Sequence, residues 1–410
     1  MTGIALTGMF LAGALLIEAR LALRPADEAA EGPAAQEREP AEARGRGLSP
    51  EQQGTRTDSL DLPPAVPGTG ERDDQPADPD SLYEMGGIQV RRNRDAEAVV
   101  TFARLAAEHP GHELADEALW QAAKAAERGG DYTRARALFG QLVDEHPRSP
   151  MRDQANWSAA FMLYCAGRHR EALYMFQRVG VDASEPHLVD QSFFWAGKSA
   201  RHLGLEPEAE VLFQAAADHF PRSYYSARAV SMGYRGSKGP RHRGHPAPDD
   251  VGFTWEDVRT AAGEAGLDPY LVLAVIRQES RFEEQAESHA GALGVMQIMP
   301  RTGRSLASKA GMGDFEKGLL ADPEVSIRMG SRYLGEQMRS FASGRTREVG
   351  FELGLAAYNA GPSAARQWVR HLPLDDADTF VERIPYKETR IYVKKVLKNY
   401  TVYKTAVSSA

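Results

Sequence analysis

The chain has 410 residues, of which 42% are hydrophobic and 26% charged. This composition is typical of a soluble globular protein with two or three domains and excludes a membrane-spanning helix bundle. The formal net charge of −8 is concentrated in residues 24–82, which hold six basic and fourteen acidic residues, and no basic face for nucleic acid is left elsewhere. A single cysteine, Cys165, excludes an internal disulfide and a Cys/His zinc framework.

Residues 1–23 begin with an uncharged apolar run from Met1 to Ile17. The run is shorter than the roughly 20 residues of a membrane span and suits a secretory signal, although no Lys or Arg precedes it. The alternative is an uncleaved anchor that continues to Leu23 and attaches the protein to the inner membrane. Both interpretations predict export to the periplasm or cell envelope.

Residues 24–82 contain nine prolines and no aromatic residue or isoleucine. Such a segment buries too little apolar surface to offset the entropy lost on ordering. We therefore expect a disordered, acidic tether, with the folded part of the chain starting at residue 83.

Residues 83–232 repeat with a period of 37. Each unit has the pattern of a helix, a glycine turn, a second helix and a proline-marked connection. The recurring residues are Gly130, Gly167 and Gly204, with Phe102, Phe139, Phe176 and Phe213 marking four successive units. The pattern resembles tetratricopeptide repeats and predicts an α-solenoid of stacked helical hairpins. Such an array is either a scaffold or a groove for an envelope protein or a glycan.

Residues 233–251 are rich in glycine, proline and basic side chains, which indicates a linker. From residue 252 to residue 410 the pattern is again helical, with short loops. We expect this last segment to be a separate compact domain.

Glu279 occupies an unusual position in this domain. A helix is predicted to begin at Asp268-Pro269, and the apolar residues three, four and seven positions before Glu279 place its carboxyl on the buried face. Burial and the nearby helix C-terminus should both raise the pKa of the carboxyl, which could then donate a proton to a leaving oxygen. A surface glutamate paired with Arg277 or Arg281 is the alternative, but neither arginine lies on the same helical face.

Four blocks follow one another around this residue. They are Glu279-Ser280 with Ser288; "GVMQIMP", ending at Pro300; "AYNAGP", ending at Pro362; and "ETR", starting at Glu388, before a tyrosine-containing helix. In this order the blocks resemble the soluble lytic murein transglycosylases, over roughly residues 254–403. The resemblance implies a lysozyme-like α fold that cleaves the β-1,4 bond between N-acetylmuramic acid and N-acetylglucosamine in peptidoglycan.

The resemblance also implies roles for individual residues. In that family a single glutamate, here Glu279, protonates the glycosidic oxygen and then serves as the base while the muramoyl 6-hydroxyl attacks C1, which leaves a 1,6-anhydro end. No second carboxylate, metal or cofactor is then needed, and Glu283, Glu284 and Glu287 lie in a polar run expected to face solvent. The other family positions, all implied to lie at the substrate, are Ser288, Met296, Gln297, Met299, Tyr358, Asn359 and Glu388.

Four of these residues carry a further expectation or an alternative. Tyr358 is expected to point its hydroxyl at the catalytic carboxyl or at the 2-acetamido group of the substrate. Met299 would supply an apolar wall, whereas core packing explains Met296 equally well. Glu388 could instead be a favourable charge in the first turn of the last helix.

Two other functions fit the same motifs. A hydrolytic muramidase of the goose-type lysozyme kind shares the expected fold and would leave reducing ends. A glycan-binding envelope scaffold would use the repeats to recruit partners without any chemistry. The family's soluble prototypes carry a long helical ring before the catalytic domain, and about four repeats are few for a closed ring.

Overall fold

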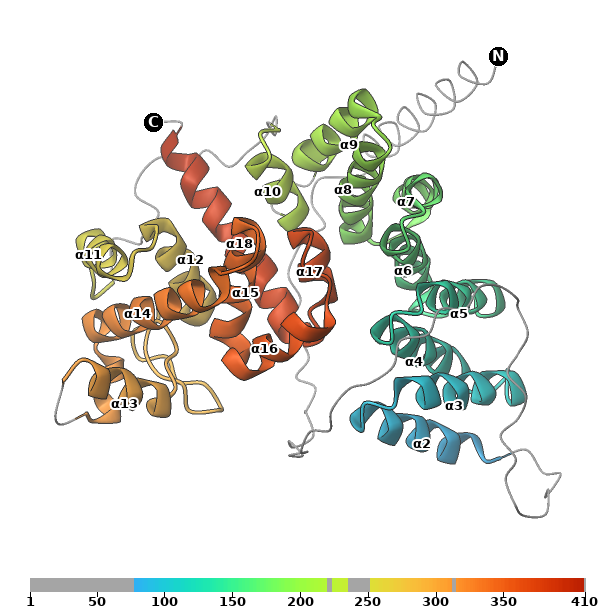
Figure 1. The fold of residues 1–410 in the computed structure, drawn as a ribbon, viewed down its shortest axis with the longest axis horizontal. Helices are drawn as coiled ribbons and strands as arrows, with labels where there is room; N and C mark the ends of the chain where they lie inside the picture. The colour runs from blue at the N-terminus through green and yellow to red at the C-terminus, as the bar shows by residue number, and fades with distance from the viewer. Residues whose placement is uncertain (1–76, 220–222, 235–250, 312–314, 409–410) are drawn as a thin grey trace.

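The computed structural model describes residues 77–219, 223–234, 251–311 and 315–408. These residues are mainly α-helical, with two isolated β-bridges in one loop, which confirms the expected all-α class. A row of helical hairpins is followed by a compact helical domain (Figure 1). The predicted signal or anchor (residues 1–23), the tether up to residue 76 and most of the predicted linker (residues 235–250) lie outside the described residues.

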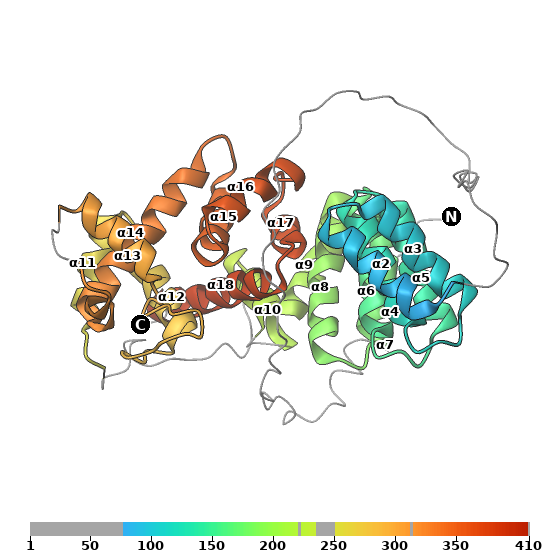
Figure 2. The ribbon, with the colours of Figure 1, turned by 90° about the horizontal axis from the view of Figure 1, so that it is seen from below.

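Four hairpins form the row. They are α2 (Pro79–Arg91) with α3 (Asp95–Glu108), α4 (Ala115–Arg128) with α5 (Tyr132–Glu145), α6 (Arg152–Cys165) with α7 (His169–Asp182), and α8 (Pro186–His202) with α9 (Glu206–His219). Each helix packs against the next one in the chain. The row stays open rather than closing into a ring (Figures 1 and 2).

The 37-residue period corresponds to one hairpin. The four repeated phenylalanines all lie in the second helix of a hairpin, and all are at most 2% exposed. The three repeated glycines follow the first helices, with φ of +80°, +73° and +71°, the left-handed region that glycine enters without a steric penalty. In the first hairpin Asn93 takes the same place with φ of 56°, and asparagine is among the few other residues that tolerate it.

The predicted start of the folded part at residue 83 is wrong by a few residues. Helix α2 begins at Pro79, inside the segment expected to be a tether. The Asp78 side chain accepts a hydrogen bond from the Ser81 N–H at 2.9 Å, and proline fits the first helical position. Leu82 is 3% exposed, so this first turn already belongs to the core.

The C-terminal domain contains the remaining helices. They are α11 (Trp255–Ala265), α12 (Pro269–Ser280), α13 (Pro300–Lys309), a 3₁₀ turn η1 (Lys317–Ala321), α14 (Pro323–Ala342), α15 (Arg347–Ala360), α16 (Pro362–His371), α17 (Ala377–Arg383) and α18 (Lys387–Ser408). Helix α18 packs against both α12 and α15. None of the described helices combines the length and the apolar character needed to cross a membrane.

Helices α10 (Tyr224–Ser231) and α17 join the hairpins to this domain. Helix α10 packs against α8 and α9 on one side and against α18 on the other. In Figure 2 α10 and α17 both lie between the hairpins and the C-terminal domain. The two parts of the molecule are thus connected by packed helices as well as by the chain.

Candidate active site

Glu279 lies in the last turn of α12. The Asp268 side chain caps this helix by accepting from the Tyr270 N–H at 3.0 Å, and Arg281 ends the helix in a left-handed conformation. The preceding residues of the inward face, Ile276, Val275 and Val272, are 0% exposed, whereas Glu279 itself is half-buried. The side chain thus sits where the buried helix reaches the domain surface.

The surroundings of Glu279 favour its protonated form. Burial raises the pKa of the Glu279 carboxyl to about 7, the charge of Glu388 acts in the same direction, and the Tyr392 hydroxyl acts against both. A carboxyl with a pKa near neutrality can donate a proton at the start of a reaction and accept one later. Glu279 therefore has the acid–base properties that the sequence led us to expect.

Tyr392 is a site residue that the sequence did not single out. It lies on α18, and its buried hydroxyl has no hydrogen-bond partner among the described residues but lies close enough to Glu279 to hold down the pKa of that carboxyl. Its position four residues after Glu388 puts both side chains on one face of α18. That spacing within the fourth block was the available signal.

Tyr358 does not bond to the Glu279 carboxyl, contrary to one of the two expectations. Its hydroxyl donates to the backbone carbonyl of Met296 at 2.8 Å. The side chain is 8% exposed, and a buried hydroxyl requires an acceptor, which the Met296 loop provides. Burial and the proximity of Glu279 both raise the pKa of Tyr358, so the two groups are electrostatically coupled without a direct bond.

The loop between α12 and α13 holds Ser288 and Gln297. The Ser288 hydroxyl accepts from the Ala292 N–H at 3.0 Å. The Gln297 amide group donates to the carbonyls of Ala286 at 2.9 Å and Gly294 at 3.0 Å. Both polar side chains therefore brace the loop that they were expected to present to a sugar, and both remain half-buried at its surface.

The two methionines of the loop have different surroundings. Met296 is 0% exposed, and its side chain packs against Gly330 and Ser331 of α14, which is the packing alternative considered for it. Met299 is 43% exposed immediately before α13. Met299 can therefore offer an apolar surface to a ligand, whereas Met296 contributes its carbonyl as the acceptor for Tyr358.

Asn359 and Glu388 lie where the end of α15 meets the start of α18. The Thr389 hydroxyl of α18 donates to the Asn359 side-chain carbonyl at 2.7 Å, which ties the end of α15 to the first turn of α18. Glu388, next to Thr389, is exposed. This contact brings the third and fourth sequence blocks together.

The backbone around Glu279 is strained. Arg281 and Phe282, directly after α12, have φ of 54° and 74°, and Gln297 has φ of 47°. Such conformations cost about 1–3 kcal/mol each and persist where the surrounding structure enforces them, which is common at functional sites. In the acidic run Glu283 and Glu287 are exposed and Glu284 is half-buried, close to the expected solvent-facing arrangement.

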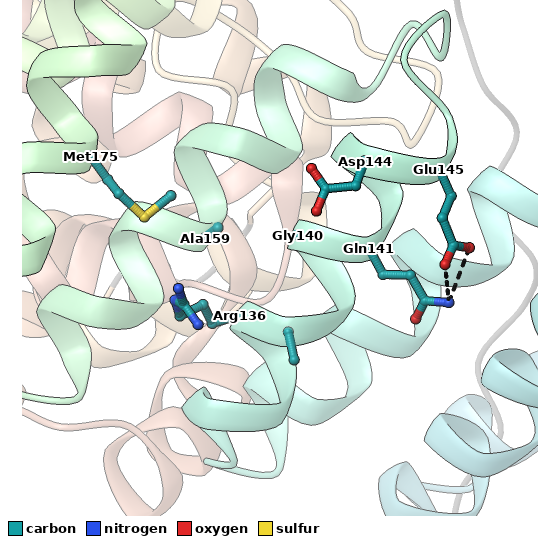
Figure 3. Close-up of a pocket in the computed structure, with 8 residues that line it drawn as sticks. Arg136, Gly140, Gln141, Asp144, Glu145, Ala159 and Met175 are labelled. Carbon is teal, nitrogen blue, oxygen red and sulfur yellow. Dashed lines mark hydrogen bonds between the residues drawn. The ribbon is translucent and has the colours of Figure 1, made fainter.

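A hollow of about 430 Å³ lies on the hairpin row, separate from this site (Figure 3). Its walls come from α5, α6 and α7, with Arg136, Asp144 and Glu145 as the charged side chains and Met175 as an apolar one. The Glu145 carboxylate is held by the Gln141 amide at 3.1 Å. The hollow gives the hairpins a small groove lined by both charged and apolar side chains.

Comparisons with known proteins match two parts of the chain. Residues 257–379 match the family described as "Transglycosylase SLT domain", and residues 80–112 and 117–149 match "Tetratricopeptide repeat". The chain thus carries a transglycosylase SLT domain in its C-terminal part, preceded by tetratricopeptide repeats.

Among curated relatives, the soluble lytic murein transglycosylase of Salmonella typhimurium is 38% identical over 134 residues, which are 32% of this chain and 20% of that protein. The membrane-bound lytic murein transglycosylase C of Actinobacillus pleuropneumoniae is 31% identical over 156 residues, 34% of this chain and 43% of the relative. The chain therefore spans less than half the length of either protein.

A solved structure shares the fold more widely. An inactive mutant of lytic transglycosylase Slt from Pseudomonas aeruginosa superimposes with a TM-score of 0.51 and 21% identity, over 82% of this chain and 59% of that one. This similarity extends beyond the SLT domain into the helical hairpins.

Proposed function

We propose that this protein is a peptidoglycan lytic transglycosylase, a carbon–oxygen lyase acting on the β-1,4 bond between N-acetylmuramic acid and N-acetylglucosamine. The observation that carries the proposal is Glu279, a half-buried acid with a pKa of about 7 that lies near Glu388 and Tyr392 of α18 and Tyr358 of α15. The match of residues 257–379 to the family described as "Transglycosylase SLT domain" supports transglycosylase activity in general.

The proposed reaction uses one carboxyl in two steps. Glu279 gives its proton to the glycosidic oxygen as the bond from C1 to that oxygen breaks. The muramoyl 6-hydroxyl then attacks C1 and returns its proton to the Glu279 carboxylate, so no water is consumed and a 1,6-anhydro end forms. Because the attacking hydroxyl belongs to the substrate, the reaction gains from proximity and needs no second carboxylate.

The protein groups around Glu279 have supporting roles in this scheme. Tyr392 stabilises the carboxylate that exists between the two proton transfers, since its contact lowers the pKa of Glu279. Tyr358 and Gln297 hold the facing loop through the Met296 and Gly294 carbonyls. Ser288, Met299, Asn359 and Glu388 are proposed to line the sugar-binding surface.

Hydrolysis is the second candidate, because a second acidic side chain, Glu388, lies near Glu279. Glu388 raises the pKa of Glu279 through its charge and is exposed, so it could orient a water molecule for attack on C1. Glycosidases with two carboxyls hold them about 5–10 Å apart. A glycan-binding scaffold, with no cleavage at all, is the third candidate.

The mass of the products separates these candidates. Purified sacculi are digested and the released muropeptides are weighed; anhydro ends, each lighter by one water, support the proposal, and reducing ends alone would show hydrolysis. Glu279→Gln should reduce cleavage by about 10²–10⁴-fold while glycan binding persists. Glu283→Gln, the same change at an exposed acid four residues away, is the matched control and should cleave normally.

The same proposal covers the location and partners of the protein. Peptidoglycan strands as substrate require a place in the periplasm or cell envelope. The hairpins, with their groove at Arg136 and Asp144, are proposed to contact an envelope protein or a glycan. Attachment to the inner membrane by residues 1–23 remains a prediction, and fractionation of cells that express the full chain tests it.

A further inference from the structure

Helix α18 separates the candidate active site from the hairpins. Helix α18 packs against α12, the helix of Glu279, and the Tyr392 side of α18 lies near the acid, where Tyr392 holds down its pKa. Lys394, two residues later, projects to the opposite side. Positions two apart on a helix do not share a face. Residues that contact Lys394 therefore fix α18 on the side opposite to Tyr392 and Glu279.

Lys394 belongs to a buried cluster of three groups, with Glu382 of α17 and Tyr225 of α10. Its ammonium group donates to the Glu382 carboxylate and to the Tyr225 hydroxyl, both at 2.8 Å, and the same hydroxyl donates to Glu382 at 2.5 Å. The side chains of Lys394 and Glu382 are 18% and 6% exposed. Tyr225 is 6% exposed and comes from the region assigned to the repeats.

Helix α17 is itself fixed to the hairpins. Asp378 accepts from Lys198 of α8 at 2.8 Å and from Arg228 of α10 at 2.5 Å. At the other end of α17, Arg383 donates to the Tyr132 hydroxyl of α5 at 2.6 Å. Glu382 is thus presented to Lys394 by a helix whose position the hairpins set.

We propose that Tyr225, with Glu382 and Lys394, is a positioning residue that holds α18 so that Tyr392 meets the Glu279 carboxyl. The hairpins then act on the catalytic acid through α18, in addition to any binding role. The inference rests on the proposed function for its catalytic meaning, but the contact it describes can be measured without turnover.

Tyr225→Phe tests this mildly, because it removes one hydroxyl and leaves the Lys394–Glu382 pair intact. The titratable groups that act on Glu279 are Tyr392 and Glu388 on α18 and, from α15, Tyr358. A loosened α18 weakens the Tyr392 contact, so the pKa of Glu279 should rise. The pKa of Glu279 is measured by ¹³C NMR titration of the full chain, and the signal of its carboxyl is assigned as the one missing from Glu279→Gln. The pH dependence of cleavage is measured in parallel.

A double-mutant cycle distinguishes positioning from general destabilisation. In a Tyr392→Phe background, Tyr225→Phe should produce no further change in the pKa of Glu279. Tyr83→Phe, which removes a hydroxyl from α2 at the far end of the hairpin row, should leave that pKa unchanged. An unaltered pKa in Tyr225→Phe, or an equal rise in both backgrounds, would overturn the inference. A wild-type chain that shows the coupling but releases no muropeptides would overturn the proposed function and not this contact.

Discussion

At the scale of single residues, the protonation of Glu279 depends on three influences, two of which favour the acid and one the anion. Desolvation is the largest and favours the protonated acid, the Tyr392 contact favours the anion, and the Glu388 charge again favours the acid. With a pKa of about 7, the carboxyl is mostly protonated below neutral pH and mostly ionised above it. Cleavage that needs the protonated acid should therefore decline as the pH rises through about 7.

Two substitutions should move this decline in opposite directions. Tyr392→Phe removes the hydroxyl that favours the anion, so the pKa of Glu279 rises and the decline shifts to higher pH. Glu388→Gln removes a like charge, so the decline shifts to lower pH. The two can be told apart by salt, since Glu388 is exposed and its effect should shrink at 1 M salt, where charges are screened within about 3 Å.

The measurement is the pH dependence of kcat/KM on purified glycan strands, at low and high salt. Shifts of the same sign in both variants would contradict the assigned contacts. If Glu388→Gln instead abolished cleavage of the glycan strands, Glu388 would have a direct chemical role. The hydrolytic candidate would then gain support.

At the scale of elements, the loop between α12 and α13 depends on one glycine. Gly294 has φ of +75°, and a Cβ atom there would lie 1.9 Å from the Leu320 carbonyl oxygen of the 3₁₀ turn. Its own N–H donates to the Ala286 carbonyl at 3.0 Å, and its carbonyl accepts from Gln297. Backbone approach and backbone conformation both require glycine at this position.

Gly294→Ala should displace the loop and lose most cleavage, with a stability cost on the order of 3 kcal/mol from strain and overlap. Gly291→Ala is the matched control: Gly291 also has a positive φ, +82°, but nothing lies within 4 Å of an added Cβ. It should cost only about 1 kcal/mol and retain cleavage. Urea unfolding and cleavage assays on both variants make the comparison, and equal losses would argue against close packing of the loop on the 3₁₀ turn.

Helix α17 depends on a buried ion pair cluster. The Asp378 side chain is 5% exposed, and although burial alone would raise its pKa, Lys198 and Arg228 hold that pKa below its ordinary value. Their stabilisation is fully present above the ordinary carboxyl pKa of about 4 and is lost as the pH falls through the lowered value. At neutral pH the cluster should therefore be intact.

Asp378→Asn leaves Arg228 without its carboxylate, while Lys198 keeps Asp376, and should cost about 3 kcal/mol of folding free energy at pH 7. The exposed pair of Arg94 and Glu97, whose side chains are each 55% exposed, provides the comparison. Glu97→Gln should cost less than about 1 kcal/mol. Equal free energies of unfolding for the two variants would show that α17 is not held by its charges.

At the scale of the whole molecule, burial of acids where the two parts meet makes stability depend on pH. Glu352 of α15 is 3% exposed, and its Oε2 has no hydrogen-bond partner. Burial and then the charge of Asp378 raise the pKa of Glu352 well above 4.5, despite Arg228 and Lys198. The folded protein thus keeps a proton that the unfolded chain releases, so stability falls as the pH rises above about 4.5.

Glu352→Gln keeps the shape of the neutral acid and removes this dependence. We expect the variant to be more stable than the wild type at pH 8 and equally stable near pH 4, with each unit of pKa difference contributing about 1.4 kcal/mol. Glu348→Gln, one helical turn earlier in the exposed first turn of α15, should show no such dependence. Thermal unfolding at both pH values is the measurement, and a Glu352→Gln variant destabilised at pH 8 would contradict a protonated Glu352.

Features that neighbouring residues encode could be predicted from the amino-acid sequence. A 37-residue period predicts hairpins because glycine at Gly130 and phenylalanine at Phe139 act within one unit. The Asp268-Pro269 start and the apolar face behind Glu279 likewise fix a helix and the side on which its acid lies. The start of α2 at Pro79 was missed because the composition of the tether outweighed a local capping signal.

Contacts between groups far apart in the chain could not be predicted in this way. Tyr392 lies more than a hundred positions after Glu279 in the sequence. The Tyr358 hydroxyl bonds to the Met296 carbonyl, 62 positions away. Lys198 and Asp378, which form an ion pair, are 180 positions apart. No periodicity relates such residues, because their contacts follow from how whole helices pack and from the need of each buried polar group for a partner. The acid could be predicted from its own helix, whereas its environment required the fold.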